Sequence, residues 1–327
     1  MIHKKDAKDW AREHMRGLWT SPMFPFTSDL QLNEAGIQIN VEHLLNVKSG
    51  GIGFGFSEPW VSTHFERKRA FEVVVDSVRS RVPTYMHTTD HSVESTINLS
   101  KHAANVGADA VMIWAPYEWA RNQQMICDYF EHVASKIDIA IILCNTPQSG
   151  ILLTPETVAS LAKIPNICAL KNDVDDATHT MLCADLCGDL IVVSNPREEY
   201  LLSMMAKFNQ QVMLDSTSVF LMQSPNFQPI QEYFELALNG NFAQASSKFQ
   251  SLESLRKVCR SISEVLLDKN GATNPIAYIK YWMELNEMSA GPVRPPMKNL
   301  SEAEKIKFCE ILKISDWQEK LFPNRKF

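Results

Sequence analysis

The chain has 327 residues, of which 45% are hydrophobic and 21% are charged, and its formal net charge is -6. This length and apolar content are sufficient for one large domain with a substantial core. The mildly acidic balance gives no electrostatic reason to expect nucleic acid or an anionic membrane as a partner. No apolar run approaches the roughly 18–20 residues needed to span a bilayer.

The N-terminus predicts a short amphipathic helix within residues 1–17. Its apolar positions Ala7, Trp10, Ala11 and Met15 fall at helical spacing. The segment is charged throughout and lacks the apolar core of a secretory signal, so we do not interpret it as one. We expect the helix to pack on the body of the protein or on a neighbouring subunit.

Short runs that favour β-strands alternate with amphipathic stretches along most of the chain. The expected strands are 17–20, 51–54, 84–87, 110–114, 139–144, 167–171, 190–194 and 212–215. The expected helices between them include 67–78, 93–106, 123–135, 155–162 and 198–208. This alternation indicates parallel strands joined by crossovers, and eight is the number that closes a barrel. The predicted fold class is therefore α/β, a (β/α)8 TIM barrel.

An open, doubly wound sheet is the alternative architecture. Such a sheet usually has a glycine-rich phosphate-binding turn after its first strand. Here the first strand is followed by TSPMFPFTSD, which contains no glycine, and GGIGFG at 50–55 lacks the required spacing. The pattern therefore favours the barrel.

The alternation stops after about residue 228. The segments 230–239, 242–266, 275–287 and 301–312 all favour helices, and PVRPP at 292–296 is expected to be a rigid connector. We therefore predict an N-terminal helix (1–17), a barrel core (18–228) and C-terminal helices packed on the barrel (229–327).

Lys171 is the most unusual residue at the expected mouth of the barrel, where the strands end and active sites lie. It closes the apolar run NICALK. Burial favours the neutral amine of a lysine, and a neutral amine can attack a carbonyl group. The alternative is a lysine that simply reaches solvent from the end of a strand.

Cys144 holds a similar position on the preceding strand. A buried cysteine is usually just a small apolar residue. It could instead act as a weak acid, or as a thiolate if a cation such as Lys171 lies nearby.

Disulfides and metal sites are not expected. The chain has seven cysteines, an odd number, and no CxxC pair, which favours a reducing, cytoplasmic location. The types of five residues would suit zinc, but no paired-histidine motif follows the first strand. Those residues are Glu58, His87, Asp90, His91 and Cys144. We predict neither a metal nor another cofactor.

Three segments resemble a known family. They are GADAVMIWAPYEW at 107–119, ILCNTPQSGILLTPETVASLAKIPNICALKND at 142–173 and NPIAYIKYWMELNEMSAGPVRPPMKNL at 274–300. With them, nearly the whole chain resembles the dihydrodipicolinate synthase/N-acetylneuraminate lyase superfamily. The resemblance implies a class I aldolase or lyase on a (β/α)8 barrel, with homotetramers and dimers as the usual assemblies.

The same resemblance assigns roles to particular residues. Lys171 matches the lysine that forms a Schiff base with the substrate. Phe54-Gly55-Phe56-Ser57-Glu58 occupies the place of the loop motif GTTGE, whose N–H groups and hydroxyls bind the substrate carboxylate. Cys144 stands where the family has its proton-relay tyrosine.

Three departures from the family pattern change the expected reaction. Cys144 replaces the relay tyrosine, and Phe56 replaces a relay threonine. The arginine that binds a second carboxylate is missing, because the loop reads Gln148-Ser149-Gly150. We therefore expect neither dihydrodipicolinate synthase nor sialic acid lyase activity.

The hydratase-aldolase branch of the superfamily, which cleaves aryl-substituted benzylidenepyruvates, is similar in places. It has a GTFGE loop that accommodates Phe56, a third-strand loop like Thr88-Thr89, and an AGPxRPP ending like residues 290–296. Phe56, Trp60 and Trp119 would suit an apolar or aromatic substrate group. This branch nevertheless keeps the tyrosine that Cys144 replaces.

We therefore expect a Schiff-base-forming lyase or aldolase that acts on a 2-oxo acid such as pyruvate or a substituted derivative. Lys171 and Cys144 are the predicted catalytic residues. Substrate binding is assigned to Gly55, Phe56, Ser57, His87, Glu118, Asn195 and Asp215. Two alternatives remain: a barrel that binds a small molecule as a sensor without turnover, and a different reaction that depends on Cys144.

Overall fold

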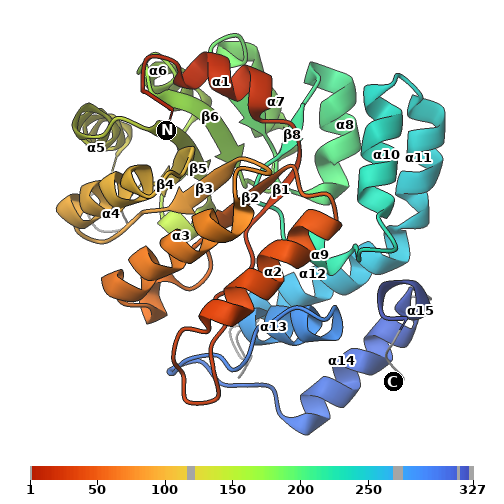
Figure 1. The fold of residues 1–327 in the computed structure, drawn as a ribbon. Coiled ribbons are helices and arrows are strands. Elements are labelled where there is room, and N and C mark those ends of the chain that lie inside the picture. The colour runs from red at the N-terminus through yellow and green to blue at the C-terminus, as the bar shows by residue number, and fades with distance from the viewer. Residues whose placement is uncertain (1, 116–121, 268–274, 315–316, 324–327) are drawn as a thin grey trace.

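The computed structural model describes residues 2–115, 122–267, 275–314 and 317–323. Within these residues, eight parallel strands form one sheet in the order β7-β6-β5-β4-β3-β2-β1-β8. Figure 1 shows the strands enclosed by helices, which confirms the predicted (β/α)8 barrel. The strands are β1 (Gly17–Thr20), β2 (Gly51–Phe54), β3 (Thr84–His87), β4 (Ala110–Trp114), β5 (Ala140–Asn145), β6 (Ile167–Asn172), β7 (Val192–Ser194) and β8 (Val212–Met213).

A serine hydroxyl joins the two ends of this sheet order. Ser194 Oγ in β7 donates to Val212 O (2.9 Å) and accepts from Leu214 N (3.0 Å). The hydroxyl therefore bridges β7 and β8 where no backbone ladder runs between them. As a result, the residues that follow β8 reach the same mouth of the barrel as those that end β6.

The helices of the outer ring follow the strands in order. They are α2 (Glu34–Asn46), α3 (His64–Val78), α4 (Val93–Asn105), α5 (Gln123–Lys136), α6 (Pro155–Leu161), α7 (Ala177–Cys187), α8 (Glu198–Phe208) and α10 (Pro229–Leu238). Because α10 packs against α8 and β1, it completes the ring, although it lies in the segment 229–327. Short helical segments follow three strands: η1 (Pro59–Val61), η2 (Pro147–Ser149) and α9 (Ser218–Leu221).

The interior of the barrel is filled by side chains, and one end is closed by the N-terminal helix α1 (Ala7–His14). Inward-facing Trp19, Tyr85 and Met112 belong to a buried cluster that also contains Trp10 and Met15. Gln211, just before β8, donates to Met15 O (2.8 Å), so α1 closes the end at which the strands begin. The expected packing of this helix on the body is confirmed. The helix leaves open the opposite end of the barrel, where the strands end.

Further C-terminal helices lie beside the ring. They are α11 (Phe242–Ser251), α12 (Glu253–Leu267), α13 (Pro275–Leu285), α14 (Glu302–Ile314) and α15 (Gln318–Leu321). A buried network joins α12 to the barrel. Arg256 donates to both oxygens of Glu198 on α8, at 2.5 and 2.9 Å, and Tyr233 Oη on α10 donates to Glu198 Oε1 (2.7 Å). This network fixes the C-terminal helices to the ring.

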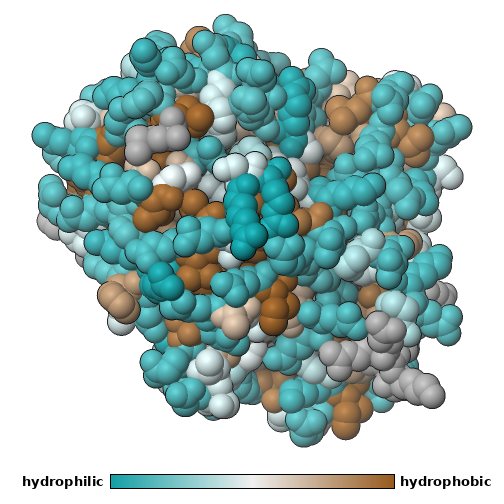
Figure 2. Space-filling view, in the orientation of Figure 1, coloured by the Kyte–Doolittle hydropathy of each residue, from teal (hydrophilic) through white to brown (hydrophobic). Residues whose placement is uncertain are grey.

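The face of the molecule drawn in Figure 2 is largely hydrophilic, and its hydrophobic side chains are scattered in small patches. Among the helices that the structure describes, none is both long and apolar enough to cross a bilayer.

Candidate active site

Lys171 lies in a cluster of polar side chains at the mouth of the barrel. Its Nζ donates to Asp215 Oδ2 (2.8 Å), and His87 Nε2 at the end of β3 lies 3.3 Å from the same oxygen. The other carboxylate oxygen, Oδ1, accepts from Tyr85 Oη (2.7 Å) and from Ser21 Oγ. The ends of β1, β3, β6 and β8 therefore converge on one carboxylate.

The Lys171–Asp215 pair is shielded from water, with side-chain exposures of 2% and 1%. Burial lowers the pKa of Lys171, as expected, but the Asp215 carboxylate outweighs it and holds that pKa above its ordinary value. Burial likewise raises the pKa of Asp215, while Lys171 and His87 lower it further than burial raises it. The expectation of a neutral Lys171 amine is therefore wrong for the free protein, because the pair consists of an ammonium and a carboxylate.

The backbone at Asp215 explains how its carboxylate reaches Lys171. The inward positions here are Val212 in β8 and Leu214 directly after it, so regular alternation would turn Asp215 away from the barrel. Asp215 instead has φ 57°, in the left-handed region that few non-glycine residues adopt. This turn of the backbone brings the Asp215 carboxylate within hydrogen-bond distance of Lys171 Nζ.

His87 is a neutral ring held in a fixed position. Burial lowers its pKa and outweighs the opposing effect of Asp215. Arg67 on α3 fixes the end of β3 by donating to His87 O (2.9 Å) and Thr89 O (3.0 Å). Both ring nitrogens of His87 are buried and have no hydrogen-bond partner among the described residues.

Aromatic rings cover one side of the lysine. The centroid of the Phe56 ring lies 3.8 Å from Lys171 Nζ. The same ring lies 4.6 Å from the His87 ring and 5.3 Å from the Trp114 ring, measured between centroids. This wall suits an apolar or aromatic group on a substrate.

The loop after β2 presents backbone N–H groups beside this wall. Gly55 has φ +97°, and a Cβ added there would lie 3.4 Å from His87 O, so a glycine is favoured. The N–H groups of Phe56 and Ser57 make no hydrogen bond within the part of the chain that the structure describes. Successive free N–H groups in a turn form an anion-binding nest. The loop can therefore bind a carboxylate next to Lys171.

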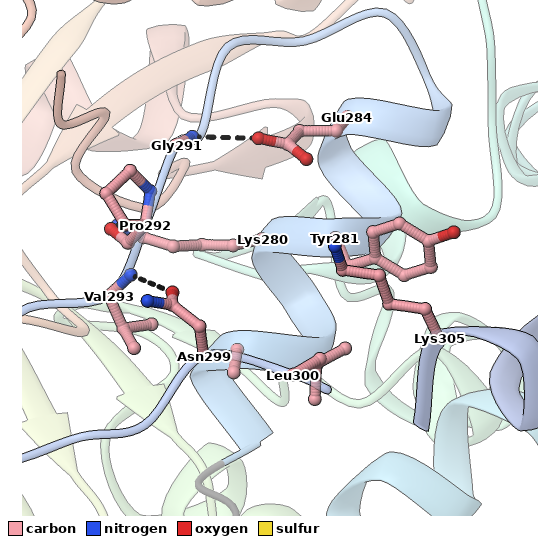
Figure 3. A pocket seen from close by; sticks show the side chains of 10 residues that line it. Lys280, Tyr281, Glu284, Gly291, Pro292, Val293, Asn299, Leu300 and Lys305 are labelled. Atoms are coloured by element: carbon pink, nitrogen blue, oxygen red, sulfur yellow. Dashed lines mark hydrogen bonds between the residues drawn. The ribbon is translucent and has the colours of Figure 1, made fainter. Parts of the chain in front are cut away.

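A buried ion pair anchors the end of this loop to α13. Glu58 Oε2 accepts from Phe24 N (3.0 Å), and Glu58 Oε1 lies 3.3 Å from Lys280 Nζ. Lys280 also donates to Pro292 O (2.9 Å). Figure 3 shows Lys280 reaching toward Pro292 beside a pocket of about 230 Å³ between α13 and the connector 291–300. The residues that line this pocket are not those around Lys171, and its Lys280 pairs with Glu58 at the end of the loop after β2.

The connector also fixes two loops at the mouth of the barrel. Arg294 donates to Val61 O (2.8 Å) after β2 and to Leu30 O (3.0 Å) after β1. It also pairs with Glu66, whose pKa it lowers to about 2. Through Arg294, the AGPVRPP segment therefore holds the loops after β1 and β2 in place.

Cys144 lies opposite Lys171 in the register of β5 and β6. It is fully buried, and burial raises the pKa of its thiol to about 12. At neutral pH it is therefore a thiol and a poor nucleophile. A reaction that depends on a Cys144 thiolate finds no support in this environment, whereas its role as a relay beside Lys171 stays a prediction.

Not every predicted residue reaches this cluster. Asn195 Nδ2 donates to Thr180 Oγ1 (3.0 Å) and its Oδ1 accepts from Arg197 N (2.9 Å), so its side chain is engaged away from Lys171. Glu118 lies outside the described residues. Within them, no group of three or more His, Cys, Asp or Glu side chains is placed to hold a metal ion.

Comparison with known proteins decides the family. The sequence profile described as "Dihydrodipicolinate synthetase family" matches residues 14–315. The chain belongs to this family. A 4-hydroxy-tetrahydrodipicolinate synthase of Methanothrix thermoacetophila is 31% identical over 308 residues, which cover 92% of this chain and 97% of that protein.

Solved structures agree with this membership. A dihydrodipicolinate synthase crystal structure has 26% identity and a TM-score of 0.77, covering 91% of this chain and 98% of that one. YagE from E. coli K12, solved in complex with pyruvate, has 24% identity and a TM-score of 0.80, with coverages of 92% and 98%. The family expected from the motifs is therefore confirmed, and so is the expected enzyme class, a lyase of the class I aldolase type.

Proposed function

We propose that this family member forms a Schiff base between Lys171 and a 2-oxo acid, and that it uses the imine for lyase or aldolase chemistry. The observation that carries the proposal is the position of Lys171. Its Nζ lies 3.8 Å from the centroid of the Phe56 ring, and Phe56 belongs to the loop whose N–H groups at 56 and 57 make no hydrogen bond within the described residues. A 2-oxo acid bound with its carboxylate on these N–H groups would bring its carbonyl carbon to Nζ. The resulting iminium would act as an electron sink at the neighbouring carbon.

The surroundings of Lys171 favour a substrate with one carboxylate and an apolar or aromatic substituent. Phe56, His87 and Trp114 supply the aromatic wall. The loop at 148–150 has no arginine for a second carboxylate. Pyruvate or an aryl- or alkyl-substituted pyruvate is therefore the proposed substrate class. Homo-oligomerisation stays a prediction from the resemblance.

Reductive trapping tests the proposal. The protein is incubated with a panel of 2-oxo acids, beginning with pyruvate, then reduced with borohydride and mapped by peptide mass. We expect an adduct on Lys171 and none on Lys280, the other lysine that is buried among the described residues, because Lys280 is held by Glu58 and Pro292. The variant Lys171→Arg should form no adduct, because its guanidinium stays protonated.

The same experiment separates the alternatives. No adduct on Lys171 with any 2-oxo acid would contradict the proposed function. A 2-oxo acid that raises the melting temperature of the protein without an adduct or turnover would favour the alternative of a barrel that binds a small molecule as a sensor.

A further inference from the structure

We propose that Asp215 is the catalytic acid–base of imine formation, carrying protons between Lys171 Nζ and the oxygen that leaves the substrate. This inference rests on the proposed function and adds to it a residue that takes over the work of the missing relay tyrosine. Asp215 Oδ2 touches the reacting nitrogen at 2.8 Å.

The contacts of the Asp215 carboxylate divide between its two oxygens. Oδ1 is held by Tyr85 Oη and by Ser21 Oγ, so its orientation is fixed. Oδ2 faces the reacting side, with Lys171 Nζ and His87 Nε2 beside it. One oxygen is therefore anchored while the other is free to exchange protons, which is the arrangement a positioned acid–base requires.

The proton balance of imine formation fits this arrangement. The ammonium of Lys171 carries three protons, and the iminium retains one. Asp215 accepts the first from Nζ, the amine attacks the carbonyl carbon as the C–N bond forms, and Asp215 returns that proton to the carbonyl oxygen. It then carries a second proton from nitrogen to the hydroxyl, the C–O bond breaks, and water leaves. The buried site begins as ammonium and carboxylate and ends as iminium and carboxylate, so its net charge does not change.

The neighbouring groups are less suited to this role. Burial raises the pKa of the Cys144 thiol to about 12, so near neutral pH the thiol keeps its proton and is a weak acid. Tyr85 donates to Asp215 rather than to Lys171, and burial raises the pKa of its hydroxyl. His87 Nε2 lies 3.3 Å from Asp215 Oδ2, but Lys171 Nζ donates its hydrogen bond to Asp215 and not to His87.

Two substitutions at position 215 test the proposal, measured as the rate of pyruvate trapping on Lys171. Asp215→Asn and Asp215→Gly both tolerate the left-handed backbone. We expect Asp215→Asn to slow trapping by about 10²- to 10⁴-fold, the range for loss of a general acid–base. In Asp215→Gly, added formate should restore part of the rate by occupying the vacated space. Asp175→Asn is the matched control, because Asp175 also follows β6 but is exposed and pairs with Arg197, and its rate should match the wild type.

The pH dependence adds a readout that a purely structural role would not change. The charged and titratable groups around Nζ and Asp215 are Lys171, His87, Tyr85, Cys144 and Asp173. In the wild type the proton passes within the pair, so the trapping rate should be level around neutral pH and fall in acid as Asp215 is protonated. In Asp215→Asn burial lowers the pKa of Lys171 and only solvent can take the proton from Nζ, so the rate should climb with pH through that lowered pKa.

The outcomes are distinguishable. If the wild type is not trapped at all, the proposed function fails. If the wild type is trapped and Asp215→Asn reacts at the same rate with the same level profile, the role of Asp215 is overturned. If neither variant at position 215 folds, Tyr85→Phe provides the test. Loss of the Tyr85 hydroxyl donor raises the pKa of Asp215, so the fall of the trapping rate in acid should begin at a higher pH. If the rate of Tyr85→Phe falls at the same pH as that of the wild type, the proposal is overturned.

Discussion

Replacing Lys171 with methionine should lower the free energy of unfolding by about 3 kcal/mol, the lower end of the cost of leaving a buried charge without its partner. Asp215 would keep its donors Tyr85 and Ser21 but lose the ammonium at 2.8 Å. The double variant Lys171→Met/Asp215→Asn removes both charges and should recover most of this loss. Urea denaturation of the wild type, Lys171→Met, Asp215→Asn and the double variant measures the coupling energy between the two residues.

The deficit of Lys171→Met should also depend on pH. Without Lys171, burial raises the pKa of Asp215 above its value in the unfolded chain. A raised carboxyl pKa destabilises the folded state at high pH, and this penalty falls as the pH is lowered through the raised value. The deficit should therefore shrink from pH 8 to pH 5. A stability loss equal in the single and double variants, and constant with pH, would contradict the buried ion pair.

The second large effect concerns Glu198. Replacing it with glutamine should lower the free energy of unfolding by about 3 kcal/mol, because Arg256 would stay charged and buried with only the more distant carboxylate of Glu253, at 3.6 Å. The two side chains are only 3% and 4% exposed, and Tyr233 shares the same carboxylate. Denaturant unfolding measures this loss.

Glu199→Gln provides the matched control for Glu198. Glu199 is the next residue on α8 and also pairs with an arginine, Arg260, but its side chain is 29% exposed. Partly exposed ion pairs contribute roughly 0–1 kcal/mol, so this variant should unfold almost like the wild type. Equal losses in the two variants would contradict the idea that the Glu198 network holds the C-terminal helices to the ring.

The barrel could be predicted from sequence because its signal is local and repeated. Each strand is a short apolar run, and the expected bounds of β1 to β4 coincide with the observed ones. Lys171 could be selected for the same reason, as a lone charge at the end of the apolar run that forms β6.

The chemistry around Lys171 was harder to predict because it depends on contacts between distant parts of the chain. Asp215 was expected only to bind substrate, since regular alternation gives no reason for it to meet Lys171. Its left-handed backbone brings the carboxylate to the lysine, and that contact reverses the expected charge state of Lys171. Tyr85 was missed, although its spacing of two from His87 in one strand places both side chains on the inner face.

A crystal structure of the protein after soaking with pyruvate tests the central claim most directly. We expect continuous density from Lys171 Nζ to the second carbon of pyruvate, with the carboxylate on the N–H groups of Phe56 and Ser57. Asp215 Oδ2 should remain within hydrogen-bond distance of Nζ. Pyruvate bound at the mouth beside an unmodified Lys171, still paired with Asp215, would contradict the account.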